Sequence, residues 1–114
     1  MTRTVAWPRA IRQVLMSVLG PDGRSAQSER QSVYNFALNA SGVGTDDTGL
    51  PETLKTYIEK LTHSPYKILD RDVDALRDAG YSEDQIYEIT IANALGAAAG
   101  RYQRTMELLN REIT

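Results

Sequence analysis

Apolar residues recur at helical spacing along most of the chain, whereas no segment alternates apolar and polar residues with period two. The longest pattern runs to the C-terminus in alternating steps of three and four positions, and it predicts one helix of roughly 30 residues. We expect the other elements to pack around this helix. Its apolar positions from residue 92 onward are Ala92, Leu95, Ala99, Tyr102, Met106, Leu109 and Ile113.

Local signals mark where this long helix begins. Ser82 is a suitable N-cap residue, and Gln85 stands three positions later, which is the spacing of a reciprocal capping box. Tyr81 and Ile86 occupy the two positions of a hydrophobic staple. The sequence therefore predicts that the helix starts at this point.

Two helices are predicted in the N-terminal part of the chain. Pro8 suits the first turn of a helix with an apolar face, and Gly20-Pro21 ends it. Ser28 and Gln31 repeat the capping-box spacing ahead of a second apolar stripe. We therefore expect a helical pair here.

Two more helices are predicted before the long one. Pro51 opens a third helix, and Pro65 disfavours helix at the residue before it, which places His63 at a helix end. Asp70 can cap a short fourth helix, and Gly80 supplies the left-handed position that terminates it.

Together these elements predict an all-α fold, a compact bundle of about five helices built around one long C-terminal helix. The 114 residues, 41% of them hydrophobic, suffice for one domain with a single core, and self-association would add to its stability. We divide the domain 1–114 into an N-terminal helix pair (1–40), a flexible loop (41–49) and a core segment (50–114). The loop is expected to be mobile because it combines three glycines with small polar residues.

Composition excludes several classes of function. The 13 Lys and Arg are interspersed with 15 Asp and Glu, for a net charge of -2, which gives no electrostatic case for a nucleic-acid partner. The absence of cysteine excludes disulfides, thiolate metal sites and thiol redox chemistry within the chain. Arg3, Arg9, Arg12 and Gln13 interrupt the N-terminal apolar residues, so we expect no membrane span or signal peptide and a soluble, cytoplasmic protein.

The long helix contains a turn of small residues, GAAAG from Gly96 to Gly100. Together with Asn93, Gly96 and Gly100 fall on one stripe of this helix. Each glycine costs about 1 kcal/mol relative to alanine in a helix interior, so a compensating interaction is expected. We interpret the stripe first as the site of close approach of another helix, from the same chain or from a second subunit. A ligand pocket lined by small residues is the alternative.

The segment Asp70 to Ile91, DRDVDALRDAGYSEDQIYEITI, resembles the alkylhydroperoxidase D-like (AhpD-like), or carboxymuconolactone decarboxylase-like, family. That family commonly shows D-x-D-[VI]-x-A-L-[RK]-x-A-G, then S-[ED]-[ED]-x-I and a long alanine-rich helix. The resemblance extends back to Leu50 and is faint before it. It implies an all-helical bundle that assembles into homo-oligomers, often trimers or hexamers.

In redox members of that family, the chemistry rests on C-x-x-C followed by a histidine four residues on. Counted back from Gly80, these positions are occupied here by Pro65, Ile68 and Asp72. A hydroperoxidase of that type needs one thiolate to attack the peroxide and a second to resolve the sulfenate. The resemblance therefore implies the fold without the peroxidase activity.

The family also contains decarboxylases that use no metal or organic cofactor. In the polar segment HSPYKILDRD, His63 is the candidate general acid/base, Tyr66 a candidate proton donor and Lys67 a candidate anchor for a substrate carboxylate. This hypothesis requires the three side chains to converge on a pocket with the glycine stripe. The competing interpretation of His63 is an exposed residue that interacts with the helix dipole.

No metal or cofactor is predicted. With one histidine and no cysteine, the chain cannot assemble a transition-metal site of ordinary composition by itself. Asp46-Asp47 lacks the ligand spacing of a calcium loop.

Basic residues gather near the C-terminal end of the long helix. Arg101, Arg104 and Arg111 complement the helix dipole there and can pair with Glu107 and Glu112 at helical spacing. A solvated charged face is the first interpretation, and an anion-binding strip at a subunit interface is the second.

Three hypotheses of function remain. The principal one is a non-redox helical protein that self-assembles or binds a small ligand, because the apolar stripe of the long helix is longer than a five-helix monomer easily covers. Its expected partner is a second copy of the chain. The second is a cofactor-free decarboxylase or isomerase acting on a small carboxylated compound. The third is an accessory subunit whose partner carries the catalytic groups.

Overall fold

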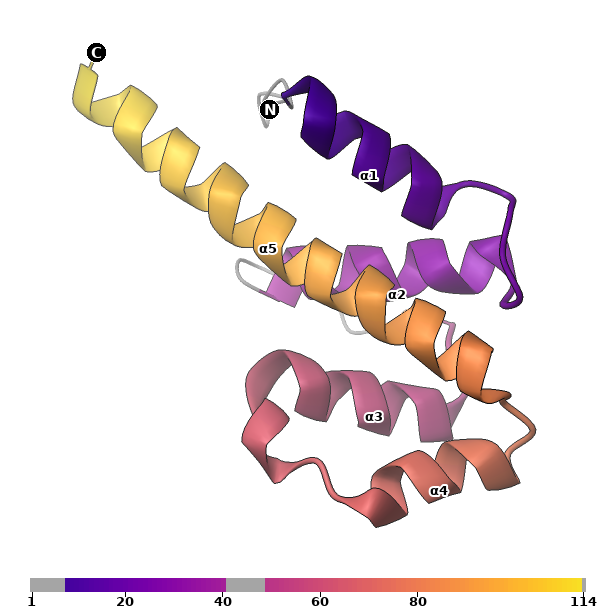
Figure 1. Cartoon of the computed structure of the whole chain (residues 1–114). Coiled ribbons are helices and arrows are strands. Elements are labelled where there is room, and N and C mark those ends of the chain that lie inside the picture. Colours follow the sequence, from indigo (N-terminus) through magenta and orange to yellow (C-terminus); the bar gives the residue numbers. More distant parts are fainter. Residues whose placement is uncertain (1–7, 41–48, 114) are drawn as a thin grey trace.

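The computed structural model of the protein describes residues 8–40 and 49–113, which form an all-α fold as the sequence predicts (Figure 1). A one-turn 3-10 helix, η1, was not predicted. Of the segment 41–49, which is expected to be a flexible loop, residues 41–48 lie outside the described residues. The elements are α1 (Arg9–Leu19), α2 (Gln27–Ala40), α3 (Glu52–His63), η1 (Pro65–Lys67), α4 (Asp70–Asp78) and α5 (Glu83–Ile113).

The predicted start of the long helix is confirmed. The Ser82 amide donates to Gln85 Oε1 at 2.9 Å, and the Gln85 amide donates to Ser82 Oγ at 3.2 Å, so the capping box is closed in both directions. Helix α5 then continues for 31 residues. Gly80, which precedes this cap, has a φ of 102°, the left-handed conformation expected of a residue that terminates α4.

Two other predicted caps are wrong. Helix α2 begins at Gln27, so Ser28 lies inside its first turn. Side-chain Nε2 of Gln31 donates to the Leu19 carbonyl oxygen at 3.4 Å and does not close a capping box with Ser28. Helix α4 is capped by Leu69, and Asp70 is already helical. The carboxylate that accepts the Leu69 amide, at 2.8 Å, belongs to Asp72.

The core lies where α2 and α3 pack against the N-terminal half of α5, and α4, which packs against α3, adds Leu76 to it. Branched aliphatic side chains dominate it, and Tyr57 is the one aromatic ring buried below a tenth of its surface among the described residues. Its phenol oxygen lies 2.7 Å from Thr90 Oγ1, which satisfies the polar end of the ring. The central core residues are Val33, Leu54, Tyr57, Ile58, Leu76, Ile86, Ile89 and Ala92.

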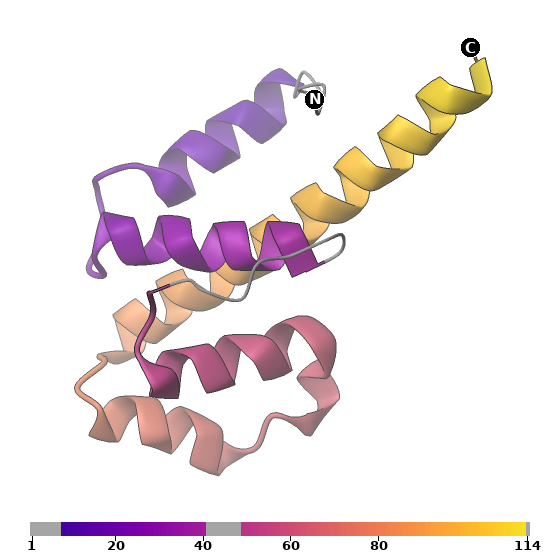
Figure 2. The ribbon, with the colours of Figure 1, turned by 180° about the vertical axis from the view of Figure 1, so that it is seen from behind.

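The molecule is elongated because α5 is longer than the bundle that it supports. At 1.5 Å per residue this helix spans about 46 Å, whereas the molecule measures 52 × 28 × 24 Å along its principal axes. Its C-terminal part extends beyond the other helices in both views (Figures 1 and 2). Within the described residues, every helix is too short or too polar to cross a membrane.

Candidate functional site

The three predicted catalytic side chains do not form an enclosed site. His63 ends α3, Tyr66 and Lys67 belong to η1, and all three are exposed, with 79% of Tyr66 accessible to solvent. Lys67 Nζ lies 6.0 Å from the centre of the Tyr66 ring, a cation–π distance for groups that both face water. The geometry thus gives the decarboxylase hypothesis no support.

The small-residue stripe of α5 serves as a contact surface for α2. A Cβ atom on Gly96 would collide with the carbonyl oxygen of Tyr34 and would lie 3.0 Å from the Cβ of Ala37. The backbones of α2 and α5 therefore approach so closely that only glycine fits at this position. Gly100, one turn later, is also buried.

The third residue of the stripe, Asn93, faces α3. It is 1% exposed, and its amide nitrogen donates to Thr62 Oγ1 at 2.9 Å. Thr62 Oγ1 in turn donates to the carbonyl oxygen of Ile58 at 2.7 Å. Asn93 is thus a satisfied polar group between α3 and α5, and its amide is occupied by the protein itself.

The predicted basic strip lies on the exposed part of α5. Arg101, Arg104 and Arg111 are exposed, and the predicted pairing of Arg101 and Arg104 with Glu107 does not occur among the described residues. The Glu112 side chain lies outside the description.

A polar cluster that sequence analysis did not identify joins α1, α2 and α5. Its centre is Arg30 of α2, which is only 1% exposed. Arg30 Nε donates to the Val18 carbonyl oxygen at 2.9 Å, and its two terminal nitrogens donate to the carbonyl oxygens of Ser25 and Gly20. One guanidinium group therefore binds a backbone carbonyl of the last turn of α1 and two in the connection between α1 and α2.

The carbonyl oxygens that Arg30 binds include those at the C-terminal end of α1. This end has no basic residue of its own in its last turn. Gln27, in the first turn of α2, donates to the remaining Leu19 carbonyl oxygen at 3.1 Å. Side chains of α2 thus cap α1, and the positive charge of Arg30 complements the dipole of α1.

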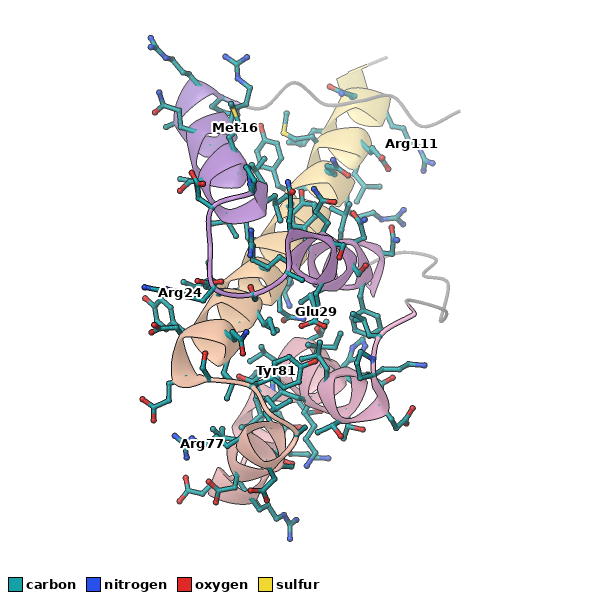
Figure 3. All side chains as sticks on the ribbon, turned by 90° about the vertical axis from the view of Figure 1, so that its right-hand side faces the viewer. Met16, Arg24, Glu29, Arg77, Tyr81 and Arg111 are labelled. Carbon is teal, nitrogen blue, oxygen red and sulfur yellow. The ribbon has the colours of Figure 1, made fainter. Side chains whose placement is uncertain are left out.

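Glu88 of α5 binds the backbone amides of the same connection between α1 and α2. Its carboxylate accepts from the Arg24 amide at 2.8 and 2.9 Å, and from the amide and hydroxyl of Ser25 at 2.8 and 2.7 Å. Figure 3 shows Arg24 on the loop that lies against the N-terminal half of α5. We call Arg30, Glu88 and the segment 20–25 that they bind the loop clamp.

The two charges of the loop clamp also face each other. Arg30 Nη1 lies 3.6 Å from Glu88 Oε1, and the two side chains are 2% and 24% exposed. Burial raises the pKa of the Glu88 carboxyl, but hydrogen bonds from Arg24 and Ser25 and the charge of Arg30 outweigh burial and lower the pKa below its ordinary value. Glu88 is therefore ionised at neutral pH.

The side chains of helix α1 pack only weakly against the rest of the chain that the structure describes. None of its side chains is buried, although its sequence has a clear apolar face. Ile11 and Val14 are 39% and 49% exposed. By the 100° step of a helix they share a face with Val18, whereas Met16, which is 75% exposed, points the opposite way.

Helix α5 carries an apolar stripe that begins beside α1 and continues along the exposed C-terminal part of the helix. Ile91 lines a groove together with Val18, so it marks the side of α5 that faces α1. Tyr102 and Leu109 fall on the same stripe as Ile91, and Leu109 is 50% exposed. We call the apolar positions Ile11, Val14, Tyr102 and Leu109 the α1–α5 face.

Two further open grooves flank α4, and none of the predicted site residues lines either of them. One lies beside the ion pair of Lys60 with Asp72, whose atoms are 2.8 Å apart. In the other, Arg77 contacts both Asp74 and Glu83 at 3.0 Å. Asp72, Arg77 and Glu83 are therefore paired within the protein. The carboxylate of Glu52, which also lines the first groove, forms no ion pair in the described part of the chain. Among the described residues, His, Asp and Glu do not gather in groups of three or more that could bind a metal ion.

Comparison of the chain with protein-family models, curated proteins and solved structures finds no match. The resemblance of Asp70 to Ile91 to the alkylhydroperoxidase D-like family therefore rests on that motif alone.

Proposed function

We propose that the protein is a non-redox helical assembly protein of the alkylhydroperoxidase D-like type, which associates with further copies of itself through the α1–α5 face. One observation carries the proposal. Helix α1 has an apolar face, yet none of its side chains is buried within the described chain. Isolated helices of this length are marginal in water and gain most of their stability from packing, so a face of this kind is expected to be covered in the assembled protein.

The resemblance supports a second copy as the partner, because the alkylhydroperoxidase D-like family that Asp70 to Ile91 resembles assembles into homo-oligomers. By the 100° step of a helix, Arg9 of α1 and Glu107 of α5 lie on the sides opposite the α1–α5 face. The α1–α5 face therefore presents apolar side chains, which suits contact with the same apolar face of a second copy.

The alternatives find less support. The small residues of α5 at Gly96 are covered by α2, which removes the space that a ligand pocket at that position would need. The candidate catalytic groups His63, Tyr66 and Lys67 are exposed to solvent. Assembly is therefore the function that the geometry favours.

A matched pair of substitutions on α1 tests the proposal. Val14→Glu places a charge on the α1–α5 face, whereas Met16→Glu places the same charge on the opposite side of the same helix. We expect light scattering after gel filtration to give an oligomeric mass for the wild type and for Met16→Glu, and at least a tenfold weaker association for Val14→Glu. Equal masses for the two variants, or a monomeric wild type, would contradict the proposal.

A further inference from the structure

We infer that Arg30 and Glu88 are positioning residues for assembly, which hold α1 in the orientation that presents its apolar face to a second copy of the chain. The inference rests on the proposed self-association. The role assigned to the loop clamp is to orient α1, which neither the packing of the core nor the sequence motifs explain.

The first argument is the placement of the bonds. Arg30 and Glu88 contact α1 and its connection through the backbone, at the carbonyl oxygens of Val18, Gly20 and Ser25 and at the amides of Arg24 and Ser25. Backbone atoms fix the path of the chain irrespective of its side chains. The direction in which α1 leaves α2 is therefore set from α2 and α5.

The second argument is the weakness of every other restraint on α1. No side chain of α1 is buried, and Val18, near its C-terminal end, is the α1 residue that packs against the core cluster. The N-terminal end of α1, which carries Ile11 and Val14, has no comparable anchor in the core. If the clamp opened, this end would lose its fixed position while the core formed by α2, α3, α4 and α5 remained.

The third argument is energetic. A buried ion pair contributes little net stability, because desolvation offsets most of the attraction, and apolar replacements are often as stable. In some proteins the pair instead specifies one arrangement of the chain among several. The loop clamp would act in this way by fixing the orientation of α1, whose apolar face is uncovered. A second copy that binds a preorganised surface avoids the entropic cost of ordering that surface.

The fourth argument is steric. A Cβ atom on Gly23 would lie 2.7 Å from Arg30 Nη1 and 3.0 Å from Glu88 Oε1. The loop therefore passes so close to the two charged groups that a methyl group would push them aside. Gly23→Ala thus offers a way to disturb the clamp while both charges stay in place.

The test combines association with a direct view of α1. Because the chain contains no cysteine, Gln13→Cys and Ala94→Cys introduce two exposed sites for nitroxide labels, one on α1 and one on α5. Labelled protein diluted with unlabelled protein reports the distance between the two helices of one chain by pulsed electron resonance. Sedimentation of the unlabelled proteins gives the dissociation constant.

We expect the wild type to give a narrow distance distribution and to associate. Glu88→Gln should broaden the distribution and weaken association at least tenfold, and Gly23→Ala, which spares both charges, should do the same if Glu88→Gln fails to fold. Asp72→Asn is the matched control, because it removes another carboxylate that accepts a backbone amide, at a site remote from α1. It should leave distance and association unchanged.

The outcomes separate the two claims. If the wild type associates and the clamp variants associate equally well, the inference is overturned and the proposed function stands. An unchanged distance distribution in a clamp variant overturns the inference as well. If the wild type is monomeric, both the proposed function and the inference fail.

Discussion

Nη1 of the Arg30 guanidinium group lies 3.6 Å from Oε1 of the Glu88 carboxylate, and both groups bind the loop between α1 and α2. Arg30 donates to its carbonyl oxygens, whereas Glu88 accepts from its amides. The two side chains therefore balance each other's charge, and between them they satisfy both carbonyl oxygens and amide groups of the loop. Removal of either one leaves buried polar atoms without partners.

Arg30→Ala is expected to lower the free energy of unfolding by roughly 3 kcal/mol, because three carbonyl oxygens and Glu88 lose their cation. Urea denaturation measures this change. Arg71→Ala is the control, since Arg71 is exposed and should change the free energy by less than about 0.5 kcal/mol. Equal effects of the two substitutions would show that the buried arginine contributes nothing.

The sign of the change in unfolding free energy caused by Gly96→Ala tests the close approach of α2 and α5. In an isolated helix the substitution stabilises by about 1 kcal/mol, but here the added methyl group meets the Tyr34 carbonyl oxygen. We expect destabilisation by about 1–3 kcal/mol, as in other overpacked cores. Ala94→Gly, at an exposed position of the same helix, calibrates the intrinsic propensity and should cost about 1 kcal/mol. A stabilised Gly96→Ala protein would mean that α2 does not approach α5 here.

Stability should fall in acid. Hydrogen bonds from Lys60 and from the Leu69 amide lower the pKa of Asp72, and those from the loop outweigh burial and lower the pKa of Glu88. A carboxyl whose pKa is lower in the folded state contributes stability above its unfolded pKa and loses it as the pH falls through the folded value. Unfolding should therefore become easier as the pH drops below about 4.

This acid dependence can be assigned to residues. Asp72→Asn and Glu88→Gln should each flatten the plot of unfolding free energy against pH in that acidic range, because each removes one such carboxyl. Denaturation at a series of pH values measures the slope. A slope identical to that of the wild type in both variants would contradict the assignment.

His63→Gln is expected to have little effect. The side chain is exposed at the end of α3, so the substitution should change the free energy of unfolding by less than about 0.5 kcal/mol and leave association unaltered. Thermal denaturation and light scattering provide the two measurements. A loss of association in this variant would place an interface at α3 instead of at α1.

Local chemistry explains which parts of the fold could be predicted. Ser82, Gln85 and Gly80 act within a few residues of the boundary that they set, so their pattern alone locates the start of α5. The capping box predicted at Ser28 failed because the helix starts earlier. The amides of Glu29 and Arg30 already donate to the Ala26 carbonyl oxygen, at 3.1 Å each, which leaves Ser28 no cap to form.

The loop clamp could not be predicted in the same way. The hydrogen bonds of Glu88 join it to Arg24 and Ser25, more than 60 positions away, and no local pattern encodes that proximity. One signal was present: Arg30 stands on the stripe of α2 that continues through Val33 and Ala37, where a charged residue is out of place unless it is paired. The exposure of α1 is also nonlocal, because its pattern predicts an apolar face but not what covers that face.

Sedimentation of the unmodified protein over a range of concentrations tests the central claim most directly. The account predicts that the protein is associated at micromolar concentration, with a weight-average mass that rises with concentration, because a second copy covers the α1–α5 face. A mass that stays at the 12.7 kDa of one chain across this range would contradict it.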